Sequence, residues 1–187
     1  MSINMNYKWA MADSNTFDIG PIRKLIEREM LTDELWIDPF ANKNKLAKIT
    51  NDINPKYDTT YHMDALDFLK TFKDNSVSGV LYDPPYSERQ INECYESFGL
   101  DKHVTNSGYW SELRDEISRI IAPAGKCISC GWNSVGVGSN RGFKKTNLLL
   151  VCHGGMHYDT IVTVEVKVNG SLLDLCFEDD NVATELI

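Results

Sequence analysis

The stretch Val77-Ser78-Gly79-Val80-Leu81-Tyr82-Asp83-Pro84-Pro85-Tyr86 carries the clearest structural signal in this sequence. Its first six residues form a short, mostly apolar run that turn residues close, which predicts a buried strand. Two consecutive prolines stiffen the turn, and Pro84 has no backbone N–H. The Asp83 carboxylate and the Pro84 carbonyl could therefore accept the two N–H bonds of a planar exocyclic amine. Tyr86 adds an aromatic face on which a base can stack.

The same four residues, Asp83 to Tyr86, also have a purely structural interpretation. A Pro-Pro turn can simply end a strand, and aspartate before proline commonly starts turns. The rest of the sequence must therefore decide between a structural turn and a functional site.

Short apolar runs alternate with helical patterns on both sides of this strand. Strands are predicted at 35–37, 48–51, 61–63, 77–82 and 126–130, and helices at 17–30, 65–69, 88–95 and 109–121. Two further strands, 147–151 and 160–168, are predicted to form an antiparallel pair. Strands that alternate with helices favour an α/β fold with a mostly parallel sheet. The 187 residues suit one domain with a full-sized core.

Four of these predicted strands end in an aspartate. Asp38, Asp52, Asp64 and Asp83 each follow a successive strand. In open α/β sheets, ligands bind beyond the carboxyl ends of the strands. Four acids at one edge of the sheet are more than turn formation alone explains, so they predict a binding site there.

Together these motifs resemble the class I S-adenosylmethionine-dependent amino-methyltransferases, and in particular small phage-type DNA adenine-N6 methyltransferases. The signature of that family is Asp/Asn/Ser-Pro-Pro-Tyr/Phe/Trp after the fourth sheet strand, which Asp83 to Tyr86 matches. The resemblance implies a single Rossmann-like methyltransferase domain over residues 1–187, mostly parallel with an antiparallel C-terminal hairpin, and no separate target-recognition domain. It implies methyl transfer from S-adenosylmethionine to the N6 amine of adenine in DNA, without a metal.

The resemblance also assigns roles to individual residues. Asp38 would lie near the ammonium group of the cofactor, Asp52 would bind its ribose hydroxyls, and Asp64 would accept from its adenine amine. The implied cofactor-binding residues are Phe17, Ile22, Asp38, Pro39, Phe40, Ala41, Asp52, Asp64, Ala65, Leu66 and Asp83. The implied catalytic residues are Asp83, Pro84, Pro85 and Tyr86, and the implied substrate-binding residues are Tyr86, Ser87, Arg89, Trp132 and Asn133.

The loop after Phe40 departs from the family pattern because residues 41–47 contain no glycine. Glycine normally allows a positive φ and a close approach of the backbone to the cofactor. Asparagine tolerates the left-handed conformation better than most residues, so Asn42 and Asn44 are the expected substitutes. The departure leaves a second function open, a catalytically degenerate module that binds nucleic acid or a partner subunit.

Composition limits the choice of partner. The formal net charge of −8 is unusual for a DNA-binding protein, which normally neutralises phosphates with a basic face. DNA is the expected partner, a homodimer or partner subunit could supply affinity for it, and cytosine N4, RNA or a protein amide remain alternative substrates. No apolar run is long enough to span a membrane, and no signal-peptide core is present, so a cytoplasmic location in a bacterium or a phage-infected host is expected.

Five cysteines form no disulfide framework. Cys127 and Cys130 have C-x-x-C spacing, which occurs in zinc sites. Here they fall on a predicted strand, where side chains three residues apart point to opposite faces. They are therefore predicted to be core residues.

Overall fold

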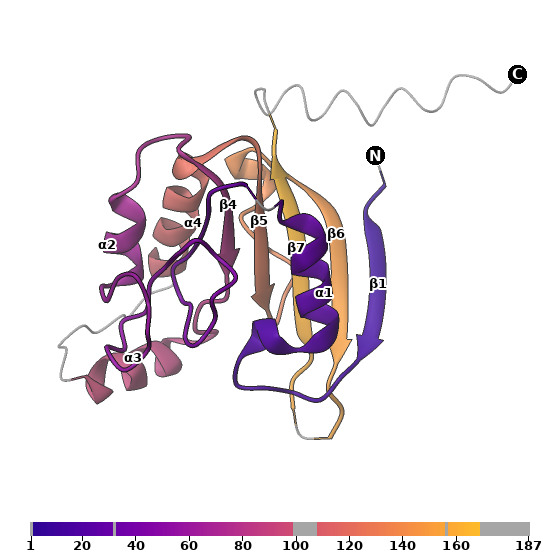
Figure 1. Cartoon of the computed structure of the whole chain (residues 1–187). Helices are drawn as coiled ribbons and strands as arrows, with labels where there is room; N and C mark the ends of the chain where they lie inside the picture. Colours follow the sequence, from indigo (N-terminus) through magenta and orange to yellow (C-terminus); the bar gives the residue numbers. More distant parts are fainter. Residues whose placement is uncertain (1, 32, 99–107, 156, 169–187) are drawn as a thin grey trace, which may run out of the picture.

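The computed structural model describes residues 2–31, 33–98, 108–155 and 157–168. Its centre is a seven-stranded sheet in the order β1-β6-β7-β5-β4-β2-β3 (Figure 1). The strands are β1 (Asn4–Trp9), β2 (Trp36–Asp38), β3 (Ile49–Thr50), β4 (Val77–Tyr82), β5 (Ile121–Gly131), β6 (Phe143–Cys152) and β7 (Thr160–Lys167). Neighbouring strands are parallel except where β7 pairs with β5 and β6. The predicted α/β class and the antiparallel final pair are confirmed.

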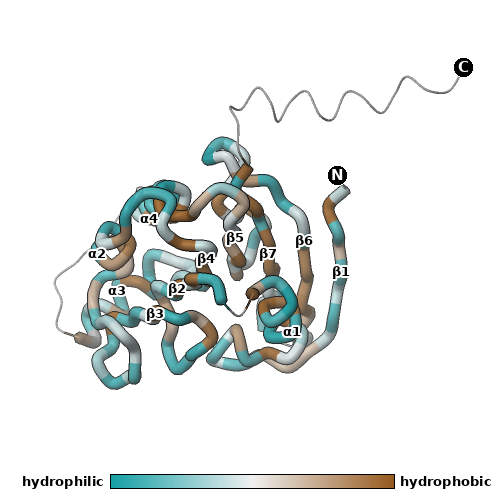
Figure 2. The backbone as a smooth tube through the Cα atoms, turned by 45° about the horizontal axis from the view of Figure 1, so that its top comes forward, coloured by the Kyte–Doolittle hydropathy of each residue, from teal (hydrophilic) through white to brown (hydrophobic). Residues whose placement is uncertain are grey.

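Helices cover both faces of this sheet. They are α1 (Gly20–Glu29), α2 (Ala65–Lys70), α3 (Glu88–Ser97) and α4 (Gly108–Ile120), with the short 3-10 helices η1 (Thr16–Asp18) and η2 (Ser139–Arg141). One buried cluster joins α1 to β5, β6 and β7. The other joins α2, α3 and α4 to β4 and β5. Figure 2 shows hydrophobic stretches in β5 and β7. Strand β5 contributes residues to both clusters, and β7 contributes residues to the cluster with α1.

The side chains of β4 and β5 alternate between these two clusters. Val80 packs in the cluster with α4, and Leu81 packs in the cluster with α1. Cys127 and Cys130 are buried in different clusters, so the prediction that they face opposite sides of the sheet is confirmed. Among the described residues, no three His, Cys, Asp or Glu side chains gather in a metal-binding arrangement.

Two features of the sheet differ from the sequence prediction. Residues 61–63 form no strand, because only an isolated bridge links Tyr61 to Asn51, and Tyr61 and His62 are exposed. The edge strand β1 was not predicted. All six of its residues are exposed, so they need not be apolar, and the sequence shows no apolar run from which the strand could be predicted.

Predicted element boundaries also shift. The predicted helix 17–30 is divided into η1 and α1, and Pro21 occupies the first turn of α1, where a missing N–H is tolerated. Strands β5 and β6 are longer than predicted. No described helix is long and apolar enough to cross a membrane.

The direction of the strands determines where a site can form. Strands β1 to β6 all run the same way, so their carboxyl ends share one edge, which is the lower edge in Figure 1. The turn after β4, the loops after β2 and β3 and the β6–β7 connection therefore all meet at this edge. This is the location that the strand-end aspartates predicted.

Candidate active site

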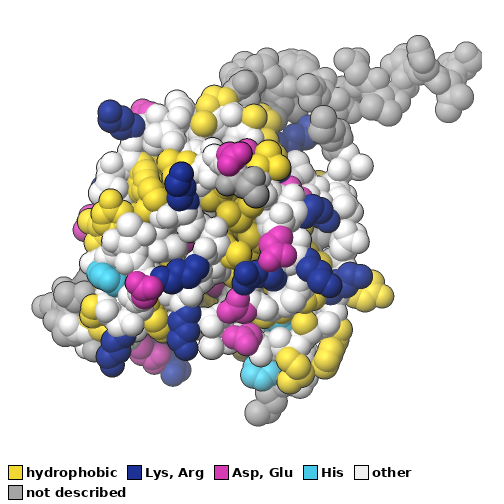
Figure 3. Space-filling model, in the orientation of Figure 1, with side chains coloured by type: hydrophobic (Ala, Val, Ile, Leu, Met, Phe, Trp, Pro, Cys, Tyr) yellow, Lys and Arg dark blue, Asp and Glu magenta, His cyan; other side chains and the backbone are white. Residues whose placement is uncertain are grey.

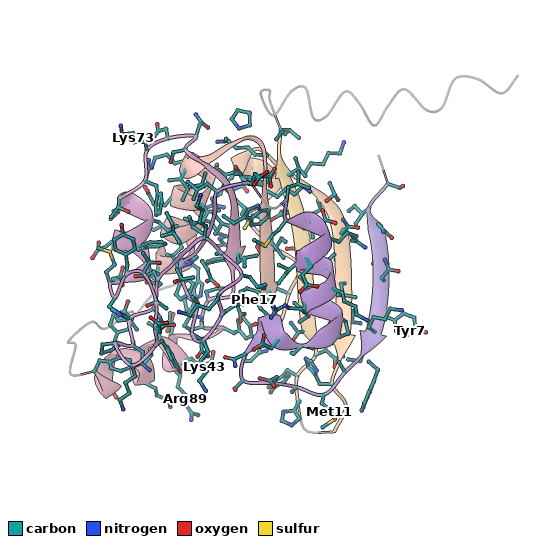
Figure 4. All side chains as sticks on the ribbon, in the orientation of Figure 1. Tyr7, Met11, Phe17, Lys43, Lys73 and Arg89 are labelled. Carbon is teal, nitrogen blue, oxygen red and sulfur yellow. The ribbon has the colours of Figure 1, made fainter. Side chains whose placement is uncertain are left out.

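A cavity of about 450 Å³ opens at the carboxyl edge of the sheet. This volume is typical of sites for small molecules and cofactors. Its lining comes from residues 14–17 before α1, the loops after β2 and β3, Asp83 to Tyr86, and α3, with single residues from the starts of α2 and α4. In Figure 4, Phe17 lies beside the strand ends, and Lys43 and Arg89 lie on the same lower side of the molecule.

Most of the predicted site residues meet in this cavity. Its lining includes Phe17, Pro39, Phe40, Ala41, Asp52, Ala65, Asp83, Pro84, Pro85 and Tyr86. Ile22 and Leu66 lie instead in the two buried clusters. Asp38 and Asp64 are close neighbours of the lining but do not belong to it. The structure thus brings together predicted residues that lie between Phe17 and Tyr86 in the sequence.

The glycine-free loop after β2 adopts the backbone conformation that glycine would normally provide. Asn42 has φ of 51°, whereas Asn44 is not among the residues with positive φ. The loop is held by hydrogen bonds from Ala41 N to the Asn51 carbonyl (2.9 Å) and from Asn42 N to Asp52 Oδ2 (2.9 Å). The expected substitution for glycine is confirmed at Asn42 only.

This conformation gives a prediction about stability. Asn42→Val should lower the free energy of unfolding by about 1–2 kcal/mol, because a β-branched residue is strained at positive φ. Asn42→Gly should stay within about 1 kcal/mol of wild type. Urea unfolding measures both, with Lys43→Val as the control at the exposed next position. If Asn42→Val is as stable as Lys43→Val, the left-handed conformation at residue 42 is wrong.

Asp52 connects the loops after β2 and β3. Its Oδ1 accepts from Asn54 N (2.8 Å), and its Oδ2 accepts from Asn42 N (2.9 Å). Burial raises the pKa of Asp52, and the two backbone N–H groups partly oppose that rise. Since the half-buried carboxylate also lines the cavity, it can accept hydrogen bonds from the hydroxyl groups of a ligand.

Asp38 and Asp64 have protein partners that explain their positions. Asp38 is fully buried, with Oδ1 accepting from Phe40 N (2.9 Å) and Oδ2 without a partner among the described residues. Burial raises its pKa well above the ordinary value. Asp64 caps α2 through Leu66 N (2.9 Å) and accepts from the hydroxyls of Tyr95 and Tyr109. Their cofactor contacts stay predictions.

The turn after β4 presents a pair of acceptors. The Asp83 carboxylate accepts a hydrogen bond from the Tyr86 hydroxyl. In the described part of the chain no group donates to the Pro84 carbonyl, whereas the Pro85 carbonyl accepts from Trp110 Nε1 (3.0 Å). Of the two proline carbonyls, only that of Pro84 is therefore available to a substrate amine.

The predicted substrate residues lie at different distances from this turn. The Trp132 ring packs on the Tyr86 ring, with centroids 5.2 Å apart. Ser87 caps α3 by accepting from Gln90 N (3.3 Å). Arg89 is exposed and pairs with Glu93 (2.6 Å), and Asn133 accepts from Val135 N (3.0 Å). Trp132 is thus the predicted substrate residue whose ring packs against the turn although it is distant in sequence.

Sequence reasoning missed three contributions to the cavity. Residues 14–16 close one side, and Cys94 and Tyr95 of α3 close another together with Phe98, which follows that helix. Asn51 is buried, and its side chain binds the Pro39 carbonyl (3.1 Å) and both the N–H and carbonyl of Met63 (3.0 Å each). The asparagines at 42, 44, 51 and 54 were the available signal, because such a concentration suggests a loop network.

The cavity contains polar atoms that suit a cofactor of the expected type. Asn15 Oδ1, Asn42 Oδ1 and Asn44 Nδ2 are buried without a hydrogen-bond partner among the described residues, and all three residues line the cavity. A buried polar group left unpaired costs about 1–3 kcal/mol. A ligand that carries both donors and acceptors, such as the amino-acid part of S-adenosylmethionine, would remove that cost.

Comparison with known proteins identifies the fold. No family model matches the sequence, and no curated protein is significantly similar to it. Among solved structures, TrmN from Thermus thermophilus is 14% identical with a TM-score of 0.52, and the match covers 80% of this chain and 49% of that chain. This chain therefore spans about half the length of TrmN.

Two further similar structures are of methyltransferases. A Burkholderia thailandensis 1,6-didemethyltoxoflavin-N1-methyltransferase with bound S-adenosylhomocysteine is 9% identical, with a TM-score of 0.55 and coverage of 80% and 78% of the two chains. The N-methyltransferase NodS from Bradyrhizobium japonicum is 10% identical, with a TM-score of 0.51 and coverage of 84% and 100%. The chain has the Rossmann-like methyltransferase fold.

Proposed function

We propose that this protein is an S-adenosylmethionine-dependent methyltransferase that acts on the N6 amine of adenine in DNA. The observation that carries the proposal is the turn Asp83 to Tyr86, which lines the same cavity as the Asn42–Asp52 loop network. Two acceptors and an aromatic ring thus lie beside the polar atoms that suit the cofactor. The fold supports the proposal, because the similar structures are methyltransferases.

Asp83 and Pro84 would act on the amine. The lone pair of an exocyclic amine is delocalised into the ring, which makes the nitrogen a poor nucleophile. The Asp83 carboxylate and the Pro84 carbonyl would each accept a hydrogen bond from one N–H, which favours a tetrahedral nitrogen whose lone pair is no longer delocalised into the ring. After the nitrogen takes the methyl group, it would lose one of these two protons. Aspartate rather than serine at position 83 favours adenine over cytosine in the family that the motif resembles.

The remaining residues would position the reactants. Asp52, Phe40 and the asparagines of the loops after β2 and β3 would hold the cofactor, which when bound supplies an activated methyl group. Tyr86 would stack on the flipped base and offset the unstacking, which requires on the order of a few kcal/mol. Its hydroxyl must leave Asp83, or share that carboxylate with the amine, when the base enters.

Calorimetric titration with S-adenosylmethionine tests the cofactor part of the proposal. We expect micromolar binding, because the loop after β2 is already in the required conformation at Asn42. A folded protein that does not bind S-adenosylmethionine alone or with DNA would contradict the proposal and favour a degenerate module.

The acid limb of the pH–rate profile should report on Asp83. Burial raises its pKa above the ordinary value of 3.8, and hydrogen bonds from Tyr86 and Thr16 partly oppose the rise. The ionised Asp83 carboxylate is a better acceptor than the protonated acid. We therefore expect kcat/KM to be at its maximum above the raised pKa and to fall as the pH drops through it. In Asp83→Asn the amide oxygen accepts at every pH, so the limb should flatten and the activity fall only in part. An unchanged limb in this variant would assign it to another group.

A further inference from the structure

Three aromatic rings form a row along the carboxyl edge of the sheet. Tyr86 follows β4, Trp132 follows β5, and Tyr158 lies in the connection between β6 and β7. The ring centroids of Tyr86 and Trp132 are 5.2 Å apart, and those of Trp132 and Tyr158 are 4.9 Å apart. The row therefore begins at the ring that contacts Asp83 and leads outward across the edge.

Exposure increases along this row. Tyr86 is half-buried, Trp132 is 44% exposed and Tyr158 is 75% exposed. Neither the Trp132 indole N–H nor the Tyr158 hydroxyl bonds to any residue in the described ranges. Hydrophobic side chains also reach the surface at the lower right of Figure 3, beyond the end of β1, where Figure 4 labels Met11. Large exposed rings with unpaired polar atoms contribute little to folding, so they are available to a ligand.

The net charge of the whole chain and the pairing of two cations near the cavity argue against binding dominated by phosphate contacts. The net charge is −8, and two of the cations near the cavity are paired, Arg89 with Glu93 (2.6 Å) and Lys45 with Asp58 (2.6 Å). Duplex DNA is normally held by neutralising its phosphates. Stacking on aromatic rings instead requires bases whose faces are open, which unpaired strands offer and paired duplexes do not.

We infer that Trp132 and Tyr158 form a stacking platform for the bases next to the target adenine, and that the DNA substrate is single-stranded or locally unpaired. This inference rests on the proposed function and specifies its substrate. Since the rings contact one another, the bases stack on their outward faces rather than between them. The target base lies on Tyr86 while its neighbours lie on Trp132 and Tyr158.

Fluorescence anisotropy with a labelled adenine-containing oligonucleotide tests the platform without methyl transfer. Wild type should bind the single strand at least about tenfold more tightly than the matched duplex. Trp132→Ala and Tyr158→Ala should each weaken single-strand binding by about tenfold. Tyr158→Phe should bind as wild type does, because it keeps the ring.

Tyr7→Ala provides a matched control, since Tyr7 is 78% exposed on β1 and does not line the cavity. It should bind the oligonucleotide as wild type does. Equal affinity for single strand and duplex, no oligonucleotide binding, or equal affinity in Tyr158→Ala and Tyr7→Ala would overturn the inference. Failure of the proposed function is measured separately, by S-adenosylmethionine titration and by transfer to free deoxyadenosine, neither of which needs the platform.

Discussion

The Asp83→Ala variant is expected to lose methyl transfer while its fold and its affinity for S-adenosylmethionine stay close to wild type. The carboxylate is the charged member of the acceptor pair, and its removal leaves the Pro84 carbonyl alone to polarise the amine. Removing one pre-organised hydrogen-bonding group at a reacting centre typically slows an enzyme by about 100- to 1,000-fold. Single-turnover methylation of an adenine oligonucleotide measures the loss of rate. Thermal unfolding checks the fold, and calorimetric titration checks the affinity for S-adenosylmethionine.

Asp33→Ala serves as the control for this variant, because Asp33 is an exposed aspartate outside the cavity. It should leave the rate unchanged. Full activity in Asp83→Ala would refute the catalytic role of the turn after β4. A variant that fails to fold would show a structural role instead, and Asp83→Asn then tests the chemistry with the side-chain shape retained.

The Asp52→Ala variant is expected to bind S-adenosylmethionine about 10- to 150-fold more weakly, the equivalent of a charge-assisted hydrogen bond worth about 1.5–3 kcal/mol. Two effects combine in this loss. The ligand loses an acceptor for its hydroxyls, and the loops after β2 and β3 lose the carboxylate that binds Asn42 N and Asn54 N. Calorimetric titration measures the change.

Asp58→Ala is the matched control, because Asp58 is an exposed carboxylate near the same loop, paired with Lys45 and absent from the cavity lining. Its cofactor affinity should equal that of wild type. If Asp52→Ala also binds as wild type does, the ribose hydroxyls must lie elsewhere in the cavity.

Much of the site could be predicted because short-range chemistry determines it. The Val77 to Tyr86 stretch combines an apolar run with a Pro-Pro turn, and both signals are local to the sequence. Asn42 is a similar case, since its tolerance of positive φ is a property of the residue itself. The alternation of strands and helices was sufficient for the parallel sheet, and two consecutive strands joined without a helix indicated the reversed final strand.

The remaining features depend on contacts between distant segments. The pairing of β1 with β6 joins residues more than a hundred positions apart, and β1 has no buried face that would reveal it. The acceptor role of Asp64 towards Tyr95 and Tyr109 likewise depends on how α3 and α4 approach α2. Residues 61–63 were wrongly predicted as a strand because the asparagine network, with Asn51 at its centre, holds that segment instead.

The most direct test of the account is the product of the reaction. The purified protein would be incubated with S-adenosylmethionine carrying an isotopically labelled methyl group and with single-stranded DNA of mixed sequence, and the DNA would then be hydrolysed to nucleosides for mass spectrometry. We expect labelled N6-methyladenine with wild type and none with Asp83→Ala. Label in cytosine alone, or no labelled nucleoside from a protein that binds S-adenosylmethionine, would contradict it.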